Sequence, residues 1–130
     1  MIDKKLDGTG KGDFVYDINN DILMFKIKER DYEKSIEFKK FIADIDSKGF
    51  VSGIRIIDAS KIFGINKYTL SNIISWEFKT VVENGTITIR LSFVGKVRNK
   101  EVAIENFTQQ LTTLLNGHKL KESIVECATV

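Results

Sequence analysis

The first half of the chain consists of short apolar stretches separated by turn sequences, and this spacing restricts it to antiparallel hairpins. The first candidate turn is Asn19-Asn20, because asparagine adopts positive φ more easily than most residues. The register predicted around this turn places two pairs opposite each other, Tyr16–Leu23 and Phe14–Phe25. These four side chains then lie on one face of the hairpin.

A second hairpin is predicted at Asp46–Gly49, where glycine suits the left-handed position that such turns often require. A four-residue loop at this place sets Phe41 opposite Ile54. The strand then runs into a short helix in the middle of the chain. Asp58 or Ser60 is expected to cap the exposed amides of that helix.

The clearest turn of the second half is Asn84-Gly85. The register around it predicts three cross-strand pairs: Val82–Ile87, Phe78–Leu91 and Trp76–Phe93. The alternate positions are polar, so this hairpin is expected to have one dry and one wet face.

Beyond Glu101 the apolar spacing changes from strand-like to helical, at Ile104, Phe107, Leu111, Leu114 and Leu115. This spacing predicts a C-terminal helix that packs on the sheet and ends near Asn116-Gly117. A strand is the alternative for residues 102–108. Residues 123–130 alternate in a way that would add an edge strand.

The predicted strands of the first half are apolar on both faces. One face carries Tyr16, Leu23, Phe25, Ile27, Phe41, Ile54 and Ile56, and the other carries Ile18, Ile22, Met24, Ile42, Val51 and Ile57. Leaving half of the second set in water would cost several kcal/mol, at about 1.5–3 kcal/mol for each side chain. Both faces therefore need a cover, either from the second half of the chain or from a second copy.

These patterns together predict an α+β fold. We expect a flexible leader over residues 1–13 and a single domain over residues 14–130. In that domain, residues 14–64 form an antiparallel meander of about four strands and the short helix. Residues 65–130 form the second hairpin and the C-terminal helix that cover it.

The composition favours a soluble, cytoplasmic protein and excludes several classes. With 42% hydrophobic residues the chain can bury a core, while a net charge of +2 is too small to indicate nucleic-acid binding by itself. One cysteine provides no internal disulfide, and no apolar run approaches the roughly 20 residues that span a bilayer. No residue pattern calls for a cofactor or a metal ion.

Residues 14–64 resemble a family of short prokaryotic proteins, the domain-of-unknown-function family 2283. The resemblance is carried by Tyr16-Asp17, Asp21-Ile22-Leu23, Asp46 with Gly49, and the segment from Gly53 to Ser60. Arg55 departs from the family pattern, which usually has a glutamate there. Members are similar to small antitoxin-like proteins, so the resemblance implies a protein-interaction role and no established catalytic activity.

Five aspartates are the candidates for a metal or acid–base site: Asp17, Asp21, Asp44, Asp46 and Asp58. All five lie at or beside predicted turns, where aspartate commonly accepts local hydrogen bonds. His118 and Cys127 are single residues of their type and supply at most two ligands for a soft metal ion. We therefore expect turn and surface roles for all of them.

A basic cluster follows the predicted strand at Phe93 and comprises Lys96, Arg98 and Lys100, which Lys119 and Lys121 are able to extend. Together with Arg55, this cluster is the candidate contact for nucleic acid or a protein partner, and Tyr32 or Tyr68 would stack on bases. The sequence favours a small non-enzymatic protein-interaction module, with a homodimer as one form of it. The alternatives are a nucleic-acid-binding protein that uses the basic loop and a metal-assisted hydrolase that uses the turn aspartates.

Overall fold

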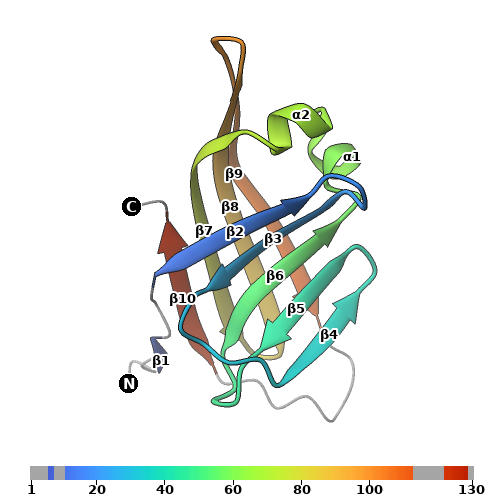
Figure 1. Cartoon of the computed structure of the whole chain (residues 1–130). Helices are drawn as coiled ribbons and strands as arrows, with labels where there is room; N and C mark the ends of the chain where they lie inside the picture. Colours follow the sequence, from blue (N-terminus) through green and yellow to red (C-terminus); the bar gives the residue numbers. More distant parts are fainter. Residues whose placement is uncertain (1–5, 8–10, 113–121, 129–130) are drawn as a thin grey trace.

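A computed structural model describes residues 6–7, 11–112 and 122–128 and shows two five-stranded sheets packed face to face (Figure 1). The front sheet has the strand order β2 (Gly12–Asp17), β3 (Ile22–Ile27), β6 (Val51–Ile57), β5 (Phe41–Ile45) and β4 (Lys34–Phe38). The back sheet has the order β1 (Leu6–Asp7), β10 (Ser123–Ala128), β7 (Ile73–Glu83), β8 (Thr86–Val97) and β9 (Lys100–Thr112). Two short helices, α1 (Ala59–Phe63) and α2 (Lys67–Leu70), connect the sheets.

The fold is therefore mostly antiparallel β-structure, with the helical part limited to one short turn region. Neither of the described helices has the length and apolar character needed to cross a membrane. In the expected leader, Leu6–Asp7 pair with β10 in parallel and β2 already begins at Gly12. Residues 1–5 and 8–10 of that leader lie outside the described part of the chain.

Two hairpin registers predicted from the sequence are confirmed. In the first hairpin Tyr16 pairs with Leu23 and Phe14 with Phe25. In the β7–β8 hairpin all three predicted pairs occur, and Asn84 and Gly85 both have the positive φ that this turn requires. The local pairing rules are sufficient here because each turn joins strands that are neighbours in sequence.

The register of the β5–β6 hairpin differs from the prediction by two residues. Phe41 pairs with Ile56, and Ala43 pairs with Ile54. An irregularity between Asp44 and Ile45 lengthens the connection. Because the displacement is even, Phe41 still lies on the face that was predicted for it.

The prediction of a C-terminal helix beyond Glu101 is wrong, because residues 100–112 form strand β9. The register between β8 and β9 shifts between two pairs, Leu91–Phe107 and Phe93–Ile104. A β-bulge next to Asn106, whose φ is 54°, thus adds a residue to β9. The bulge separates two inward side chains by three positions instead of two, which imitates helical spacing. Leu114, Leu115 and the expected helix end lie outside the described residues.

The core lies between the two sheets and is rich in aromatic side chains. Phe25 of β3 is fully buried, and its ring centroid lies 5.3 Å from that of Trp76 and 5.9 Å from that of Phe78, both on β7. On the other side of the core, Phe107 of β9 packs against Phe41 and Phe63. The dry side of the β7–β8 hairpin therefore covers the inner face of the front sheet, as the sequence predicts.

Candidate functional site

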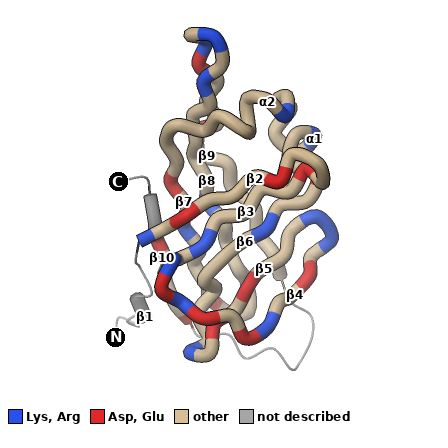
Figure 2. Tube along the Cα trace, viewed as in Figure 1, with Lys and Arg blue, Asp and Glu red and all other residues tan. Residues whose placement is uncertain are grey.

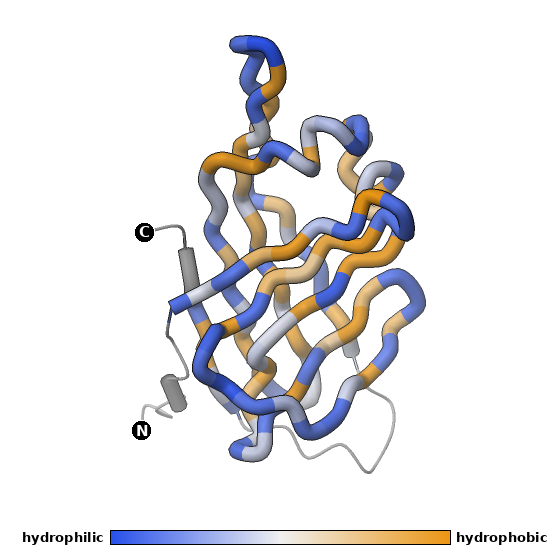
Figure 3. The backbone as a smooth tube through the Cα atoms, in the orientation of Figure 1, coloured by the Kyte–Doolittle hydropathy of each residue, from blue (hydrophilic) through white to orange (hydrophobic). Residues whose placement is uncertain are grey.

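The outer face of the front sheet carries an apolar patch that no described segment of the chain covers. It carries Val15, which is 47% exposed, with Ile18 at its edge 39% exposed. Ile22, Met24 and Ile57 complete the patch and are half-buried. Figure 1 shows this sheet as the front layer, with no described segment before it, and Figure 3 shows apolar residues along its strands. Of the six side chains predicted for this second face, Val51 and Ile42 are buried, and Ile18, Ile22, Met24 and Ile57 stay partly exposed.

The outer face of the back sheet has the opposite character. Its outward positions are mostly charged or hydroxylated: Glu77, Lys79, Glu83, Thr88, Arg90 and Ser92. This confirms the wet side predicted for the β7–β8 hairpin. An apolar outer surface is consequently a property of the front sheet and not of every sheet in the molecule.

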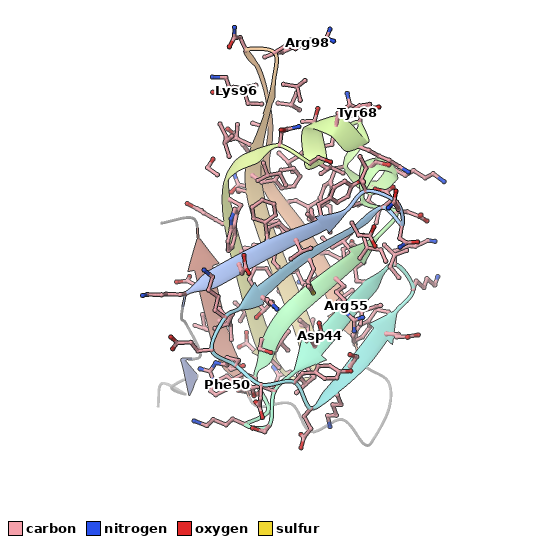
Figure 4. All side chains as sticks on the ribbon, viewed as in Figure 1. Asp44, Phe50, Arg55, Tyr68, Lys96 and Arg98 are labelled. Atoms are coloured by element: carbon pink, nitrogen blue, oxygen red, sulfur yellow. The ribbon has the colours of Figure 1, made fainter. Side chains whose placement is uncertain are left out.

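Arg55 lies on the same outer face and is held by two neighbouring strands. Its Nη2 atom donates to Asp44 Oδ1 at 2.7 Å and to Ser35 Oγ at 2.9 Å, and its Nε atom donates to Asp44 Oδ2 at 3.2 Å. The hydrogen bonds to Asp44, followed by the charge of that carboxylate, raise the pKa of Arg55 above its ordinary value against the effect of burial. Figure 4 shows the two side chains side by side. Arg55 therefore forms a polar border to the apolar patch.

Asp21 joins the first hairpin to helix α1 through a buried carboxylate that is only 5% exposed. It accepts hydrogen bonds from the Tyr16 hydroxyl at 2.7 Å, from the Ser60 hydroxyl at 2.6 Å and from the Ser60 backbone amide at 3.0 Å. Burial opposes ionisation of Asp21, but the bonds from Ser60 and Tyr16 outweigh it and lower the pKa of this carboxyl. Burial and the neighbouring Asp21 carboxylate raise the pKa of Tyr16.

The amide that Asp58 or Ser60 was expected to cap is therefore capped by Asp21, which is 39 residues away in sequence. Asp58 stands at the N-cap position of α1 with φ of 57° and makes no side-chain cap bond. Asp58 pairs instead with Lys40 at 2.6 Å. Nothing in the local spacing indicates this exchange of roles. The positive φ of 56° at Asp21, which lets its side chain turn toward α1, is a property of the folded hairpin.

The remaining candidate aspartates each have a separate partner. Asp17 accepts from Asn19 and Asn20 within its own turn, and Asp46 caps the turn amides of Lys48 and Phe50. Among the described residues, no group of three or more His, Cys, Asp or Glu side chains is placed to hold a metal ion. His118, Lys119 and Lys121 lie outside the described residues, and Cys127 belongs to strand β10.

The basic cluster lies far from Arg55, at the free end of the β8–β9 hairpin. Figure 4 shows Lys96 and Arg98 on this projecting hairpin, and Figure 2 shows cations gathered at its tip. Lys96 and Lys100 sit on its two strands, and Arg98 occupies the turn. The structure brings these three predicted contact residues together and places Arg55 on the other sheet, so the four residues do not form one surface.

The fold is that of a two-sheet β-protein with an uncovered apolar patch on one sheet. Comparison with known proteins identifies the family to which such a chain belongs. Residues 14–60 match the family described as "Protein of unknown function (DUF2283)". This segment covers the front sheet from Phe14 of β2 onward and the start of α1. An uncharacterised protein of Methanocaldococcus jannaschii is 31% identical over 100 residues, which cover 76% of this chain and 86% of the relative. The chain belongs to the DUF2283 family.

A second relative comes from Methanosarcina mazei and bears the name "Putative hypoxanthine phosphoribosyltransferase". It is 32% identical over 87 residues, which cover 67% of this chain and 71% of the relative. No solved structure matches the chain. The residues that define the family thus build the front sheet, whose outer face is free.

Proposed function

We propose that the protein is a non-enzymatic protein-interaction module that docks through the outer face of the front sheet, and that a second copy of this chain docks there. The observation that carries this proposal is the uncovered patch around Val15, Ile22, Met24 and Ile57. Contiguous exposed apolar patches of this kind mark interaction surfaces in soluble proteins.

A second copy suits this surface for electrostatic reasons. Charges of both signs surround the patch: Asp13, Asp17, Lys26, Glu37 and the Arg55–Asp44 pair. With a net charge of only +2 for the whole chain, two copies repel each other weakly. In a two-fold dimer each side chain of the patch is buried once in each copy. The favourable free energy of burying one residue therefore counts twice in the free energy of association. The antitoxin-like role implied by the family resemblance would use the same face against a different protein.

Catalysis has less support from the geometry. The five aspartates that a hydrolase would need are separated and engaged in turns, a cap and ion pairs. The phosphoribosyltransferase name of one relative implies a phosphate site, and such sites commonly use glycine-rich loops at helix N-termini. The described helices contain five and four residues, and neither follows such a loop. The outer face remains the best-supported functional surface.

The test is the solution mass of the protein and of Val15→Lys, measured by light scattering over a range of concentrations. Val15 is half exposed, so its burial contributes about 1 kcal/mol per copy and about 2 kcal/mol per dimer. Val15→Lys is therefore expected to weaken the dimer about thirtyfold. Val81→Lys, the same change at a half-buried position on the outer face of the back sheet, is the matched control and is expected to leave the mass unchanged.

Two outcomes would contradict the proposal. One is a wild-type protein that has the mass of a single chain at the highest concentration. The other is a dimer that Val81→Lys weakens as much as Val15→Lys does. Stable capture of a different protein by this face, with the purified chain monomeric, would replace the second copy as its occupant.

A further inference from the structure

We propose that the projecting end of the β8–β9 hairpin is a nucleic-acid-binding arm that enters a groove of a double helix and contacts its phosphates. We define the arm as residues 96–101, which extend beyond the pair formed by Gly95 with Ile73, the first residue of β7. It lies at the opposite end of the molecule from the β5–β6 turn (Figure 1).

The root of the arm is fixed by helix α2. The Lys96 amide donates to the backbone carbonyl of Asn72 at 3.0 Å. At Gly95 an added Cβ would lie 2.6 Å from Thr69 Cγ2 and 2.7 Å from the Thr69 carbonyl oxygen, so only glycine permits this contact. Beyond this root the two strands pair only with each other. The arm is thus a two-stranded ribbon on a rigid base.

The turn at the tip of the arm carries backbone strain. Arg98 and Asn99 have φ of 52° and 63°, which define a two-residue turn with both central residues in the left-handed region. Asparagine and glycine are favoured at such positions, whereas arginine there is disfavoured by its Cβ. Strained residues of this kind concentrate at functional sites. Arg98 thus has a strained backbone at the position that projects its guanidinium from the tip of the arm.

The cations of the arm also differ from several others in how they are paired. Elsewhere, Lys40, Arg55 and Lys79 pair with Asp58, Asp44 and Glu126. Within the described part of the chain, no ion pair is formed by Lys96, Arg98 or Lys100, although Glu101 lies opposite Lys96. All three are exposed and remain available to an external anion.

The directions of these side chains favour a groove over a flat surface. Lys96 pairs with Glu101 and Val97 pairs with Lys100, so Lys96 and Lys100 project from opposite faces of the ribbon. Arg98 extends from the tip between them. The major groove of B-DNA is about 12 Å wide and admits a two-stranded β-ribbon. A ribbon inserted there contacts phosphates on both walls of the groove. Single-stranded nucleic acid does not offer two such walls.

Tyr68 provides a further contact beside the root. It lies on α2, is 71% exposed and is followed by the residues that anchor the arm (Figure 4). An exposed tyrosine next to an arm of this type is able to pack on a sugar or a base edge at the mouth of the groove.

The test measures the affinity of the full chain for a fluorescein-labelled 20-base-pair DNA duplex by anisotropy between 50 and 200 mM salt. The arm variant carries Lys96→Gln, Arg98→Asn and Lys100→Gln, in which asparagine tolerates the left-handed turn. Loss of three phosphate contacts is expected to reduce the slope of log K against log salt by about 2.7, at about 0.9 per contact. Raising the salt from 50 to 200 mM weakens the binding of both proteins. The loss of affinity of the wild type is then expected to be about 40 times larger than that of the variant.

The matched control removes three exposed cations near the opposite end, Lys11→Gln, Lys28→Gln and Lys48→Gln, and is expected to retain the wild-type slope. The proposal is overturned if the wild type does not bind at 50 mM salt or if both triple variants lose the same slope. Equal affinity for a single strand of the same length would overturn insertion into a groove. Arm-dependent binding to anionic vesicles without binding to the duplex would assign the arm to membranes instead.

Discussion

Replacing Asp21 by asparagine tests the buried junction that holds the first hairpin to helix α1. The wild-type carboxylate accepts from three donor groups, which are the Tyr16 hydroxyl, the Ser60 hydroxyl and the Ser60 backbone amide. An asparagine side chain keeps one acceptor oxygen and presents an NH₂ group to the remaining donors. Because a hydrogen bond to a charged group contributes about 1.5–3 kcal/mol, losing one and weakening two is expected to cost about 3 kcal/mol. For a chain of this size that lowers Tm by about 10 °C.

The backbone does not confound this substitution, because asparagine adopts the φ of 56° at position 21 as easily as aspartate does. The difference in the free energy of unfolding between the wild type and Asp21→Asn also depends on pH. Since folding lowers the pKa of Asp21, its contribution is complete above the unfolded pKa of 3.8 and is lost as pH falls through the folded pKa. The stability difference between the wild type and Asp21→Asn is therefore expected to reach its maximum at pH 7 and to decrease below pH 4.

Urea unfolding followed by the fluorescence of Trp76, the single tryptophan, measures both effects. Asp17→Asn is the matched control, since it makes the same change in the same hairpin at a solvent-exposed carboxylate that bonds only its own turn. Its destabilisation is expected to be clearly smaller. Equal destabilisation by the two substitutions, or a gap for Asp21→Asn that does not change between pH 7 and pH 3, would refute the reasoning.

Two further substitutions probe the core and the arm. Phe25→Ala removes a fully buried ring that contacts Trp76 and Phe78 across the two sheets, and is expected to cost about 3–5 kcal/mol in urea unfolding. A loss below about 1 kcal/mol would mean that the sheets do not share this core. Gly95→Ala removes no charge but places a methyl group against Thr69, and is expected to destabilise the protein by about 1–3 kcal/mol and to weaken duplex binding. Unchanged stability and unchanged duplex affinity would show that α2 does not fix the root of the arm.

The parts of the fold that the sequence predicts are those governed by neighbouring residues. Asn84-Gly85 specifies its hairpin through turn chemistry, because both residues have the positive φ that the turn requires. In the first hairpin the predicted register is confirmed, but the residue with positive φ is Asp21 and not Asn19 or Asn20. The β5–β6 register is displaced because an irregularity beside Asp44 lengthens a loop that the turn residues alone do not determine.

The parts that the sequence does not predict depend on long-range contacts or on an inserted residue. The bulge at Asn106 gives β9 the apolar spacing of a helix, so the periodicity of residues 104–111 is ambiguous. The capping of Ser60 by Asp21 requires that the hairpin and α1 already lie together. The projection of Lys96, Arg98 and Lys100 from the body depends on where β7 begins to pair with β8 and on α2 packing against Gly95.

The outer face of the front sheet is best tested with a probe that lies within it. Met24 is one of two methionines and belongs to the patch, so a ¹³C-labelled methionine methyl group reports on that face directly. In a mixture of labelled and unlabelled chains, isotope-filtered NOE spectroscopy detects only contacts between copies. We predict intermolecular NOEs from the Met24 methyl group to Val15, Ile22 or Ile57. A Met24 methyl group without intermolecular NOEs at millimolar concentration would contradict the account.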